Sequence, residues 1–332
     1  MMKERVLITG VTGFVGSHLA DFLIKKDKYE LFGLKRWNLS RLRNVRHLLD
    51  KIDFLDCDVT DSIGVRNVVK EIKPDKIFHL AAESFVSMSW GHPSHYMDVN
   101  YKGTVNFLDA IKEFNLDTRF LIAGSGEEYG LVEKDMLPIT EKTSLNPVNP
   151  YSVSKIAQDL IGYVYFKSYG LNVIRTRAFN HEGPRRDYVF GISSFAYQIA
   201  KIEAGKQEPV IKVGYLDDKR NFTHVLDLVE AYYQAMIKCQ VGELYLIGNE
   251  NPEHIHTFKE CLEILIDRSE LDIKDVKIIT EPKFVRPTNV PRLIGDTRKF
   301  RDLTGWKPKI CFNDILDDVL EYWRDFVRND LY

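Results

Sequence analysis

Short apolar runs alternate with helical patterns along the first half of the chain. Residues 6–9 have the pattern of a buried strand, and glycines and a helical pattern over residues 17–26 follow. Further strands are expected at residues 29–34, 51–55, 76–80, 120–123 and 171–177, and long helices at residues 99–114 and 152–169. This alternation is typical of βαβ units. It predicts an α/β fold with a doubly wound parallel sheet.

The pattern changes after Phe179. The second half is richer in loops, with Gly-Pro, Asn-Pro and Arg-Pro pairs that begin at residues 183, 251 and 286. We find no internal repeat, low-complexity tract or flexible linker. The chain is therefore expected to form a larger unit over residues 1–178 and a smaller C-terminal lobe over residues 179–332, with some segments of the lobe returning to the sheet.

The composition excludes several classes of protein. The chain has 332 residues and a formal net charge of −2, so a polyanion-binding protein is not indicated. Its four cysteines are scattered without a Cys-x-x-Cys pair, and its nine histidines show no metal-binding spacing. No apolar run approaches the roughly 18 residues of a membrane span. We expect a cytoplasmic protein with reduced cysteines and no metal, nucleic-acid or membrane partner.

A glycine-rich turn follows the first strand. Gly10, Gly13 and Gly16 permit a tight turn, a close approach of the backbone to a diphosphate, and close packing of the next helix on the strand. Glycine-rich turns are common, so the triplet alone is weak evidence. Its place between the first strand and a helix predicts a Rossmann-type dinucleotide site. Phe14 and Val15 lie in the same turn and are also expected to contact the cofactor.

The second predicted strand ends in Lys35 and Arg36. An NAD site usually has an acidic residue here for the ribose hydroxyls. Two cations suit a 2′-phosphate instead, and a solvated basic loop is the alternative explanation. We therefore expect NADP(H). Residues after the third and fourth strands are expected to line the adenine and the ribose: Asp58, Val59, Leu80, Ala81 and Ala82.

Tyr151 and Lys155 are four residues apart, so they lie on one face of a predicted helix. A phenol with a pKa of about 10 is a poor base at neutral pH, and a nearby cation stabilises its phenolate. A surface pair has the same spacing, but this pair follows a glycine-rich first turn in the same chain. We expect Tyr151 to be the acid/base and Lys155 to bind the cofactor and assist the phenol.

Polar residues follow the predicted strand at residues 120–123. Ser125 can hydrogen-bond a substrate oxygen beside Tyr151. Two adjacent carboxylates come next, which is unusual for a purely structural turn. One of them is a candidate base for a carbon acid, and the other is expected to be solvated. We assign the chemical role to Glu127 and the solvated position to Glu128.

The glycine turn, the Ser125 segment and the Tyr151–Lys155 pair together resemble the extended short-chain dehydrogenase/reductases that act on nucleotide sugars. Further stretches narrow the resemblance to the GDP-mannose branch, and they begin at Glu83, Phe179, Val213, Arg286 and Gly305. The similarity covers nearly the whole chain. It is shared by GDP-mannose 4,6-dehydratases and GDP-4-keto-6-deoxymannose reductases, which act in succession.

The resemblance implies roles for the matched positions. It implies an NADP-binding domain with catalytic residues over residues 1–178 and a nucleotide-sugar-binding lobe over most of residues 179–332. The catalytic set would be Ser125, Glu127, Tyr151 and Lys155. A GDP-linked sugar would be held by Ser84, Asn180, Arg220 and Arg286. Two arginines suit forked recognition of phosphate oxygens, although either alone would fit a surface ion pair. The resemblance also implies a homodimer or homotetramer.

Departures from the family pattern leave the reaction open. Dehydratases generally have Ser or Asp where Gly126 stands, a group that assists loss of the C6 hydroxyl. A bound water or Glu128 is the alternative source of the proton for this loss. Their Gly-Gln-Asp-Gly turn is replaced by Gly-Phe-Val-Gly at residues 13–16. Since the four central positions are matched, the first expectation is 4,6-dehydration of GDP-mannose. The reductase, a nucleotide-sugar 4-epimerase and a non-enzymatic NADP-sensing protein are the alternatives, and the presence of Tyr151 and Lys155 disfavours the last.

Overall fold

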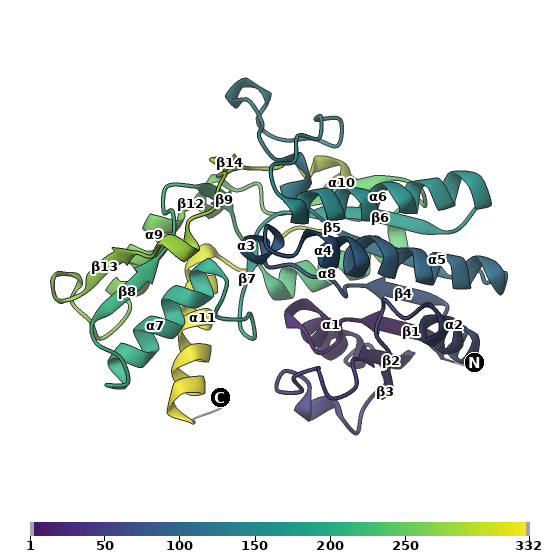
Figure 1. The fold of residues 1–332 in the computed structure, drawn as a ribbon, viewed down its shortest axis with the longest axis horizontal. Helices are drawn as coiled ribbons and strands as arrows, with labels where there is room; N and C mark the ends of the chain where they lie inside the picture. The colour runs from purple at the N-terminus through teal and green to yellow at the C-terminus, as the bar shows by residue number, and fades with distance from the viewer. Residues whose placement is uncertain (1–2, 330–332) are drawn as a thin grey trace.

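Seven parallel strands form the central sheet of the computed structural model, which describes residues 3–329 (Figure 1). Their order is β11-β6-β5-β4-β1-β2-β3, and every pairing is parallel. The strands are β1 (Glu4–Thr9), β2 (Tyr29–Lys35), β3 (Asp53–Asp56), β4 (Lys76–His79), β5 (Arg119–Ser125), β6 (Val173–Ala178) and β11 (Leu244–Ile247). The predicted α/β fold with a doubly wound parallel sheet is confirmed.

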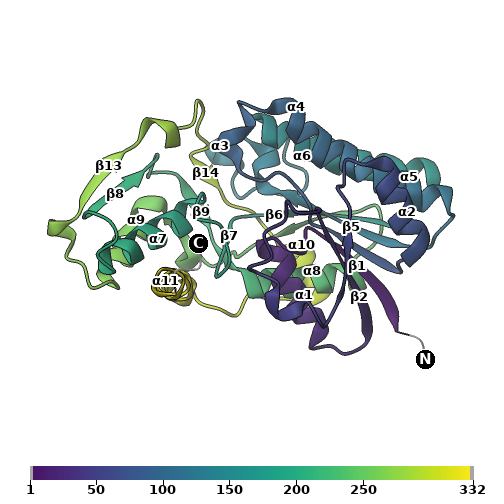
Figure 2. The same cartoon turned by 60° about the horizontal axis from the view of Figure 1, so that its bottom comes forward.

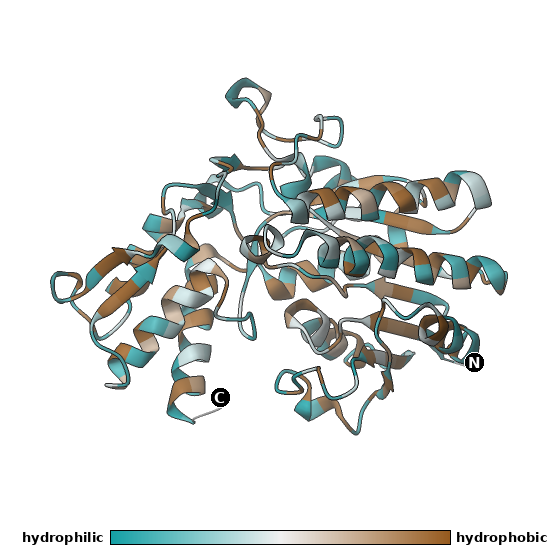
Figure 3. Cartoon of the chain, in the orientation of Figure 1, coloured by the Kyte–Doolittle hydropathy of each residue, from teal (hydrophilic) through white to brown (hydrophobic). Residues whose placement is uncertain are grey.

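Helices cover both faces of the sheet (Figure 2). Three pack on one face: α2 (Ser62–Ile72), α5 (Gly103–Glu113) and α6 (Pro150–Tyr169). Three pack on the other: α1 (Phe14–Ile24), α8 (Val225–Lys238) and α10 (Arg298–Thr304). The strands between them are largely hydrophobic (Figure 3), as expected for strands buried on both faces.

The smaller lobe has its own core around Trp323, which is fully buried. Its helices are α7 (Gly191–Glu203), α9 (Phe258–Asp267) and α11 (Phe312–Arg328), and its strands are β8 (Val210–Val213), β9 (Lys219–Asn221), β12 (Ile255–Thr257), β13 (Lys277–Thr280) and β14 (Arg292–Leu293). Apolar residues recur at helical spacing along α11, so this helix buries one face in the core. The short parallel pair β7 (His181–Glu182) and β10 (Thr223–His224) lies where the lobes meet.

The chain passes between the two cores five times within residues 3–329: after β6, before α8, after β11, before α10 and after α10. Residues 225–247 and 298–306 therefore belong to the core of the large lobe. The predicted domain limit at residue 178 coincides with the first of these passages.

The helix predicted over residues 99–114 is divided in the structure. After the short helices α3 (Val86–Ser89) and α4 (Pro93–Tyr96), a wide π-helical turn covers Met97–Lys102, and α5 begins only at Gly103. Asn100 lies in this turn, and its side-chain amide donates to Glu83 O at 3.0 Å and to Ser154 Oγ at 2.9 Å. Such turns recur at functional sites. This one joins the segment after β4 to α6.

Candidate active site

The strand order reverses between β1 and β4, and in doubly wound sheets ligands bind at the carboxyl ends of the strands beside such a reversal. The glycine turn follows β1, residues 80–82 follow β4, and Ser125 ends β5. Thr9 joins the first two segments, because its Oγ1 accepts from the N–H groups of Leu80 and Ala81, both at 3.0 Å. Segments selected from the sequence therefore meet at one edge of the sheet.

The glycine turn has room for backbone only. A Cβ atom on Gly10, whose φ is +68°, would lie 2.8 Å from Ala81 N, and one on Gly16 would lie 2.3 Å from Gly10 O. Gly13 is the N-cap of α1 and supplies no side-chain cap to its first N–H groups. Phe14 begins the helix, with Val15 next to it. An uncapped helix N-terminus behind a close-packed turn fits the diphosphate of a dinucleotide.

The two cations at the end of β2 differ in their surroundings. Lys35 forms an ion pair with Asp56 at the end of β3. Arg36 is exposed, its backbone N–H donates to Ser40 Oγ at 2.8 Å, and its guanidinium forms no ion pair with residues 3–329. Because Lys35 is already partly neutralised, Arg36 is the better candidate to bind a 2′-phosphate.

The remaining residues expected to contact the cofactor lie along the same edge. Asp58 follows β3, and its Oδ1 accepts from the N–H and the hydroxyl of Thr60 at 2.9 and 2.7 Å. Val59 is buried, and a Cβ on Gly103 would lie 2.8 Å from its side chain, so this segment packs closely on α5. The segment after β4 is partly buried at Leu80, Ala81 and Ala82. The contacts of these residues with a cofactor stay a prediction.

Tyr151 lies in the first turn of α6 and is 8% exposed. This turn forms because Asn149 Oδ1 accepts from Ser152 N–H at 2.7 Å and a proline occupies the first helical position. Burial raises the pKa of Tyr151, whereas a hydrogen bond with the Ser125 hydroxyl lowers it. The ring of Tyr96 packs edge-on against Tyr151 at 6.3 Å. The phenol therefore lies beside Ser125 in a largely dry setting.

Lys155 is buried one turn further along α6. Its Nζ donates to Ala123 O at 2.6 Å and to Gln158 Oε1. Burial lowers the pKa of Lys155 to about 8, and the carboxylates of Glu128 and Asp159 oppose this shift. The ammonium group is thus held by fixed acceptors one helical turn from the phenol, on the same face of α6.

Glu127 lies in the 3₁₀ turn Gly126–Tyr129 that follows β5. Its Oε1 is 3.9 Å from Arg286 Nη1, and its Oε2 accepts a long hydrogen bond of 3.5 Å from Asn149 Nδ2. The charge of Glu127 raises the pKa of Tyr151. Glu127 therefore lies near both the candidate acid/base and an arginine assigned to the substrate.

Glu128 is not solvated, so that expectation from the sequence is wrong. Its side chain is completely buried. Oε1 accepts from Ser125 N–H at 2.8 Å, and Oε2 forms an ion pair with Arg177 Nε at 2.7 Å. The counter-charge comes from β6, distant in sequence, and it allows a carboxylate to be buried beneath the turn.

The two arginines assigned to the substrate gather near Glu127. Arg220 is 2% exposed; its Nη2 lies 3.5 Å from Asp218 Oδ2, and its Nη1 donates to Lys219 O at 2.9 Å. Burial lowers the pKa of Arg220, and Glu127 and Asp218 raise it, whereas Arg286 lowers it further. Two arginines beside one another need anionic partners, and a diphosphate would add to the two carboxylates already present.

The other two residues assigned to the substrate are less constrained. Asn180 is half-buried, and its backbone O accepts from Thr223 N–H at 3.0 Å, which joins the segments around β7 and β10. Ser84 is exposed in the segment between β4 and α3. Their contacts with a sugar nucleotide stay a prediction.

The ring of Phe179 fills the space next to Gly126. A Cβ on Gly126 would lie 2.9 Å from Phe179 Cδ1 and 3.4 Å from Leu293 Cδ2. Phe179 is 2% exposed and also packs against two further glycines, since Cβ atoms on Gly248 and Gly295 would lie 3.2 and 2.0 Å from it. A side chain at position 126 would therefore collide with a ring that has little room to move.

Two further residues of this region, Arg186 and Asn149, were not predicted from the sequence. The charge of Arg186 acts on Tyr151. Its Nε lies 3.2 Å from Oε1 of the buried Glu182, and its guanidinium lies 4.0 Å from the centre of the Phe190 ring. Asn149 caps α6 and reaches Glu127. The Asn-Pro pair at residues 149 and 150 is a recognisable helix-start signal and could have identified the cap.

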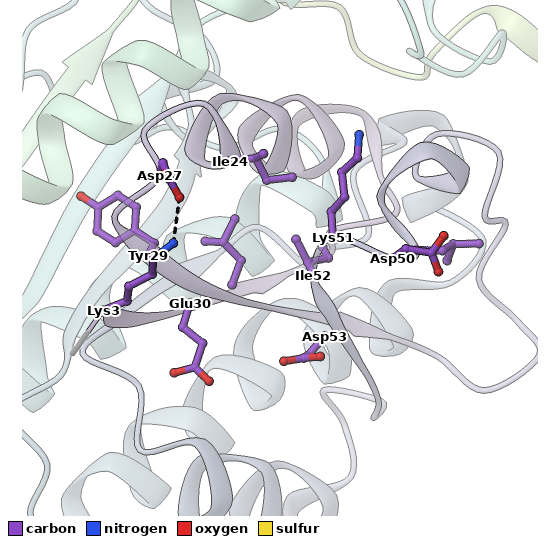
Figure 4. A pocket seen from close by; sticks show the side chains of 11 residues that line it. Lys3, Ile24, Asp27, Tyr29, Glu30, Asp50, Lys51, Ile52 and Asp53 are labelled. Atoms are coloured by element: carbon purple, nitrogen blue, oxygen red, sulfur yellow. Dashed lines mark hydrogen bonds and ion pairs between the residues drawn. The ribbon is translucent and has the colours of Figure 1, made fainter. Parts of the chain in front are cut away.

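Two surface hollows have none of the candidate catalytic residues in their lining, although Arg177, the partner of Glu128, lines the second. One of about 650 Å³ is found at the amino-terminal ends of β1 and β2, where Lys3 pairs with Asp27 at 2.8 Å (Figure 4). The other, of about 510 Å³, is lined by residues of β6, β11 and the segment 141–145. The first lies at the edge opposite to the one where such sheets bind ligands, so we assign it no role in the chemistry.

Residues 3–329 contain neither a metal-binding cluster nor a membrane-spanning helix. No group of three or more His, Cys, Asp or Glu side chains is arranged to hold a metal ion. No helix in this range is long and apolar enough to cross a membrane.

The parallel sheet, the glycine turn and the Tyr-Lys pair define the extended short-chain dehydrogenase/reductases, which confirms the resemblance found in the sequence. Comparison with known proteins narrows this class. The chain belongs to the GDP-mannose 4,6-dehydratase family, whose model, described as "GDP-mannose 4,6 dehydratase", matches residues 7–319.

Members of this family with different reactions are similar to the chain. It is 31% identical to the GDP-6-deoxy-D-mannose reductase of Pseudomonas aeruginosa, over 99% of this chain and 100% of that protein. It is 32% identical to GDP-mannose 4,6 dehydratase 1 of Arabidopsis thaliana, over 96% of this chain and 89% of that protein. The solved structure of RMD from Pseudomonas aeruginosa, complexed with NADPH, matches with a TM-score of 0.81 and 29% identity over 98% of both chains.

Proposed function

We propose that this protein is an NADPH-dependent reductase that converts the 4-keto group of a GDP-linked 6-deoxyhexose into a hydroxyl. The observation that carries this choice is the contact between position 126 and Phe179. A dehydratase needs a proton donor for the departing C6 hydroxyl, and related dehydratases have Ser or Asp at this position. A reductase needs no such donor. The end-to-end match to a reductase supports the same choice. From the sequence alone, the dehydratase is the first candidate and the reductase the second. The contact between position 126 and Phe179 favours the reductase instead.

The glycine turn and β2 supply the residues for the cofactor. Gly10, Gly13 and Gly16 would take the diphosphate and Arg36 the 2′-phosphate, as argued from their surroundings above. NADPH bound there supplies the hydride that adds to C4 of the sugar. The related structure with NADPH supports this choice of cofactor.

Tyr151 acts as the proton donor in this reaction. As C4 gains a hydride, its oxygen becomes negatively charged, and the phenol donates its proton to that oxygen, so that the carbonyl becomes an alcohol. Ser125 donates a hydrogen bond to the same oxygen, which favours the charged transition state. The Lys155 ammonium stabilises the phenolate that results. Binding of the substrate would fall to Ser84, Asn180, Arg220 and Arg286.

The 4,6-dehydratase is the second candidate, because Glu127 lies near Tyr151 and is available as a base. In that reaction a hydride would pass from C4 to bound NADP+ and return to C6, so that the cofactor is regenerated. Glu127 would remove the proton on C5 next to the transient 4-keto group, and water would leave from C6. In the reductase the same carboxylate anchors Arg286 and needs no proton transfer.

Two incubations separate these candidates. With NADPH and GDP-4-keto-6-deoxymannose, a reductase consumes one NADPH per sugar, and mass spectrometry finds a product heavier by two hydrogens. With GDP-mannose and no added reductant, a dehydratase gives a product lighter by one water, and a 4-epimerase gives an isomer of unchanged mass. Loss of water from GDP-mannose together with no oxidation of NADPH by the keto sugar would contradict the proposed function.

The proposal includes a cytoplasmic location and a homo-oligomer. All four cysteines are free, and three of them are buried, which suits a reducing compartment. The apolar residues Leu160 and Val164 on α6 are each 45% exposed, and Tyr163 between them is 38% exposed. An apolar helix face of this kind suits contact with a second copy of the chain.

A further inference from the structure

Buried ion pairs connect the three elements that carry or support the candidate catalytic groups. Glu128, in the turn after β5, pairs with Arg177 of β6, and Arg177 Nη2 lies 2.5 Å from Asp159 Oδ2 on α6. Arg175 Nη1 lies 3.2 Å from the other oxygen of Asp159. The side chains of Glu128, Arg177 and Asp159 are 3% exposed or less. The turn and the helix are therefore tied together through one strand.

Glu128 fixes the backbone of the turn directly. Its Oε1 accepts from Ser125 N–H, and this contact depends on a glycine, because a Cβ on Gly124 would lie 2.6 Å from that oxygen. Arg177, the ion-pair partner of Glu128, is also confined, since its guanidinium lies 4.8 Å from the centre of the Tyr129 ring. The carboxylate thus fixes the backbone at the start of the turn as the acidic member of a capping box, and the Ser125 hydroxyl of the same box accepts from Glu127 N–H at 3.2 Å.

Glu128 also acts on Lys155 through its charge. Burial raises the pKa of Glu128 to about 7, and Arg177, the Ser125 N–H and Lys155 favour its charged form. Burial lowers the pKa of Lys155, and Glu128 is the largest influence that raises it, ahead of Asp159. Other charged or titratable groups around the phenol and the ammonium come from six elements: Tyr232 on α8, Tyr96 on α4, His79 on β4, Glu127 in the turn, Arg177 on β6 and Arg186 in the loop after β7. Among these groups, Glu128 both touches the Ser125 backbone and favours the charged form of Lys155.

A buried network of this kind is a poor way to gain stability. Removing each ion from water costs several kcal/mol, and apolar replacements of similar volume are often equally or more stable. A turn that needs only to be stable would be served by the apolar contacts of Tyr129 and Phe179, both of which are buried. The free-energy cost of burying these ions is explained if the negative charge and the side-chain length of Glu128 contribute to the reaction.

We propose that Glu128 is a positioning residue for the proposed reduction, on which this inference rests, and that it acts through Ser125 and Lys155 while Arg177 and Asp159 hold its carboxylate. Glu128 does not touch the sugar or the cofactor in this role. It keeps the ammonium charged and the serine hydroxyl in place.

Two substitutions separate the effect of the charge of Glu128 from the effect of its side-chain length. Glu128→Gln keeps an acceptor for Ser125 N–H but removes the charge, so the pKa of Lys155 falls by about one unit or more. The basic limb of the kcat–pH profile moves to lower pH, and kcat at pH 8 falls about fivefold or more while KM changes less than about threefold. Glu128→Asp keeps the charge but is shorter, so it lowers kcat and leaves the pH profile in place.

A double variant separates chemistry from folding. Glu128→Leu with Arg177→Met replaces the ion pair by apolar side chains but leaves Asp159 with Arg175 alone and Ser125 N–H without its acceptor, so we expect a folded protein with a lower Tm. Measured below the onset of unfolding, its kcat should fall about 10-fold or more. Asp227→Asn is the matched control. This buried carboxylate also accepts backbone N–H groups, from Lys309 and Ile310 at 3.0 Å, and its loss should leave the pKa of Lys155 unchanged.

The pKa of Lys155 is measured by NMR on protein with ¹³C-labelled lysine, without any substrate, and Lys155→Arg assigns the signal. A lower pKa in Glu128→Gln supports the proposal even if the sugar proves to be a different one. If the wild type does not oxidise NADPH with the keto sugar, the proposed function fails separately. An unchanged pKa in Glu128→Gln, or an unchanged kcat in the double variant, overturns the role of Glu128.

Discussion

Replacing Gly126 with serine tests the contact on which the choice between reductase and dehydratase depends. The backbone at Gly126 is outside the left-handed region, so the contact with Phe179, 2.9 Å from the new Cβ, decides the cost. Overpacking of a buried site costs about 1–3 kcal/mol. A chain of 332 residues unfolds with an entropy near 0.7 kcal/mol per degree, so Tm should fall by about 1.5–4 °C.

The assay combines calorimetric unfolding with the GDP-mannose incubation. Replacing the ring by the smaller side chain of Phe179→Leu should relieve the collision. The free energy of unfolding of the Gly126→Ser, Phe179→Leu double variant should therefore exceed the value expected from the sum of the two single effects by about 0.5 kcal/mol or more. The Gly126→Ser variant alone should not catalyse loss of water from GDP-mannose, because the Phe179 ring occupies the space beside the new side chain. An unchanged Tm together with dehydration of GDP-mannose would refute both the contact argument and the preference for a reductase.

Four further predictions concern the rest of the site. Tyr151→Phe should lower kcat at least about 100-fold in the NADPH-oxidation assay, with NADPH affinity nearly unchanged by calorimetry. NADP(H) should bind about 10- to 100-fold more tightly than NAD(H), and Arg36→Ala should remove most of this preference in the same titration. Because burial lowers the pKa of Lys155 to about 8, the ammonium is charged below that pH, and kcat should fall as the pH rises through it. Light scattering should give a dimer or tetramer mass for the wild type and a smaller one for Leu160→Glu, and a wild-type monomer would contradict the assembly.

Much of the large lobe could be predicted from the sequence because its signals are local. Most strands before residue 178 contain a short apolar run, and each predicted helix there has a counterpart in the structure within a few residues. The π-helical turn at Met97–Lys102 was not predicted, since it depends on bonds from Asn100 to Glu83 and Ser154 in other segments. Periodicity records which residues are apolar, and it does not record such distant polar partners.

The site shows the same division between local and distant signals. Tyr151 and Lys155 could be paired from helical spacing alone. The burial of Glu128 could not, because the turn it belongs to contains no hint of Arg177, which lies on the neighbouring strand of the sheet. Lys35 resembled a free cation for the same reason, since its partner Asp56 is on another strand.

The five passages between the two cores mean that the two lobes are joined by five separate covalent connections. In a protein with two domains joined by one linker, a single broken peptide bond separates the parts. Here each lobe is made of non-contiguous pieces: residues 225–247 lie in the core of the large lobe, while the segments on either side of them lie in the small one. After one cut in any passage, the other four would still join the lobes, and neither lobe is a single continuous stretch of chain.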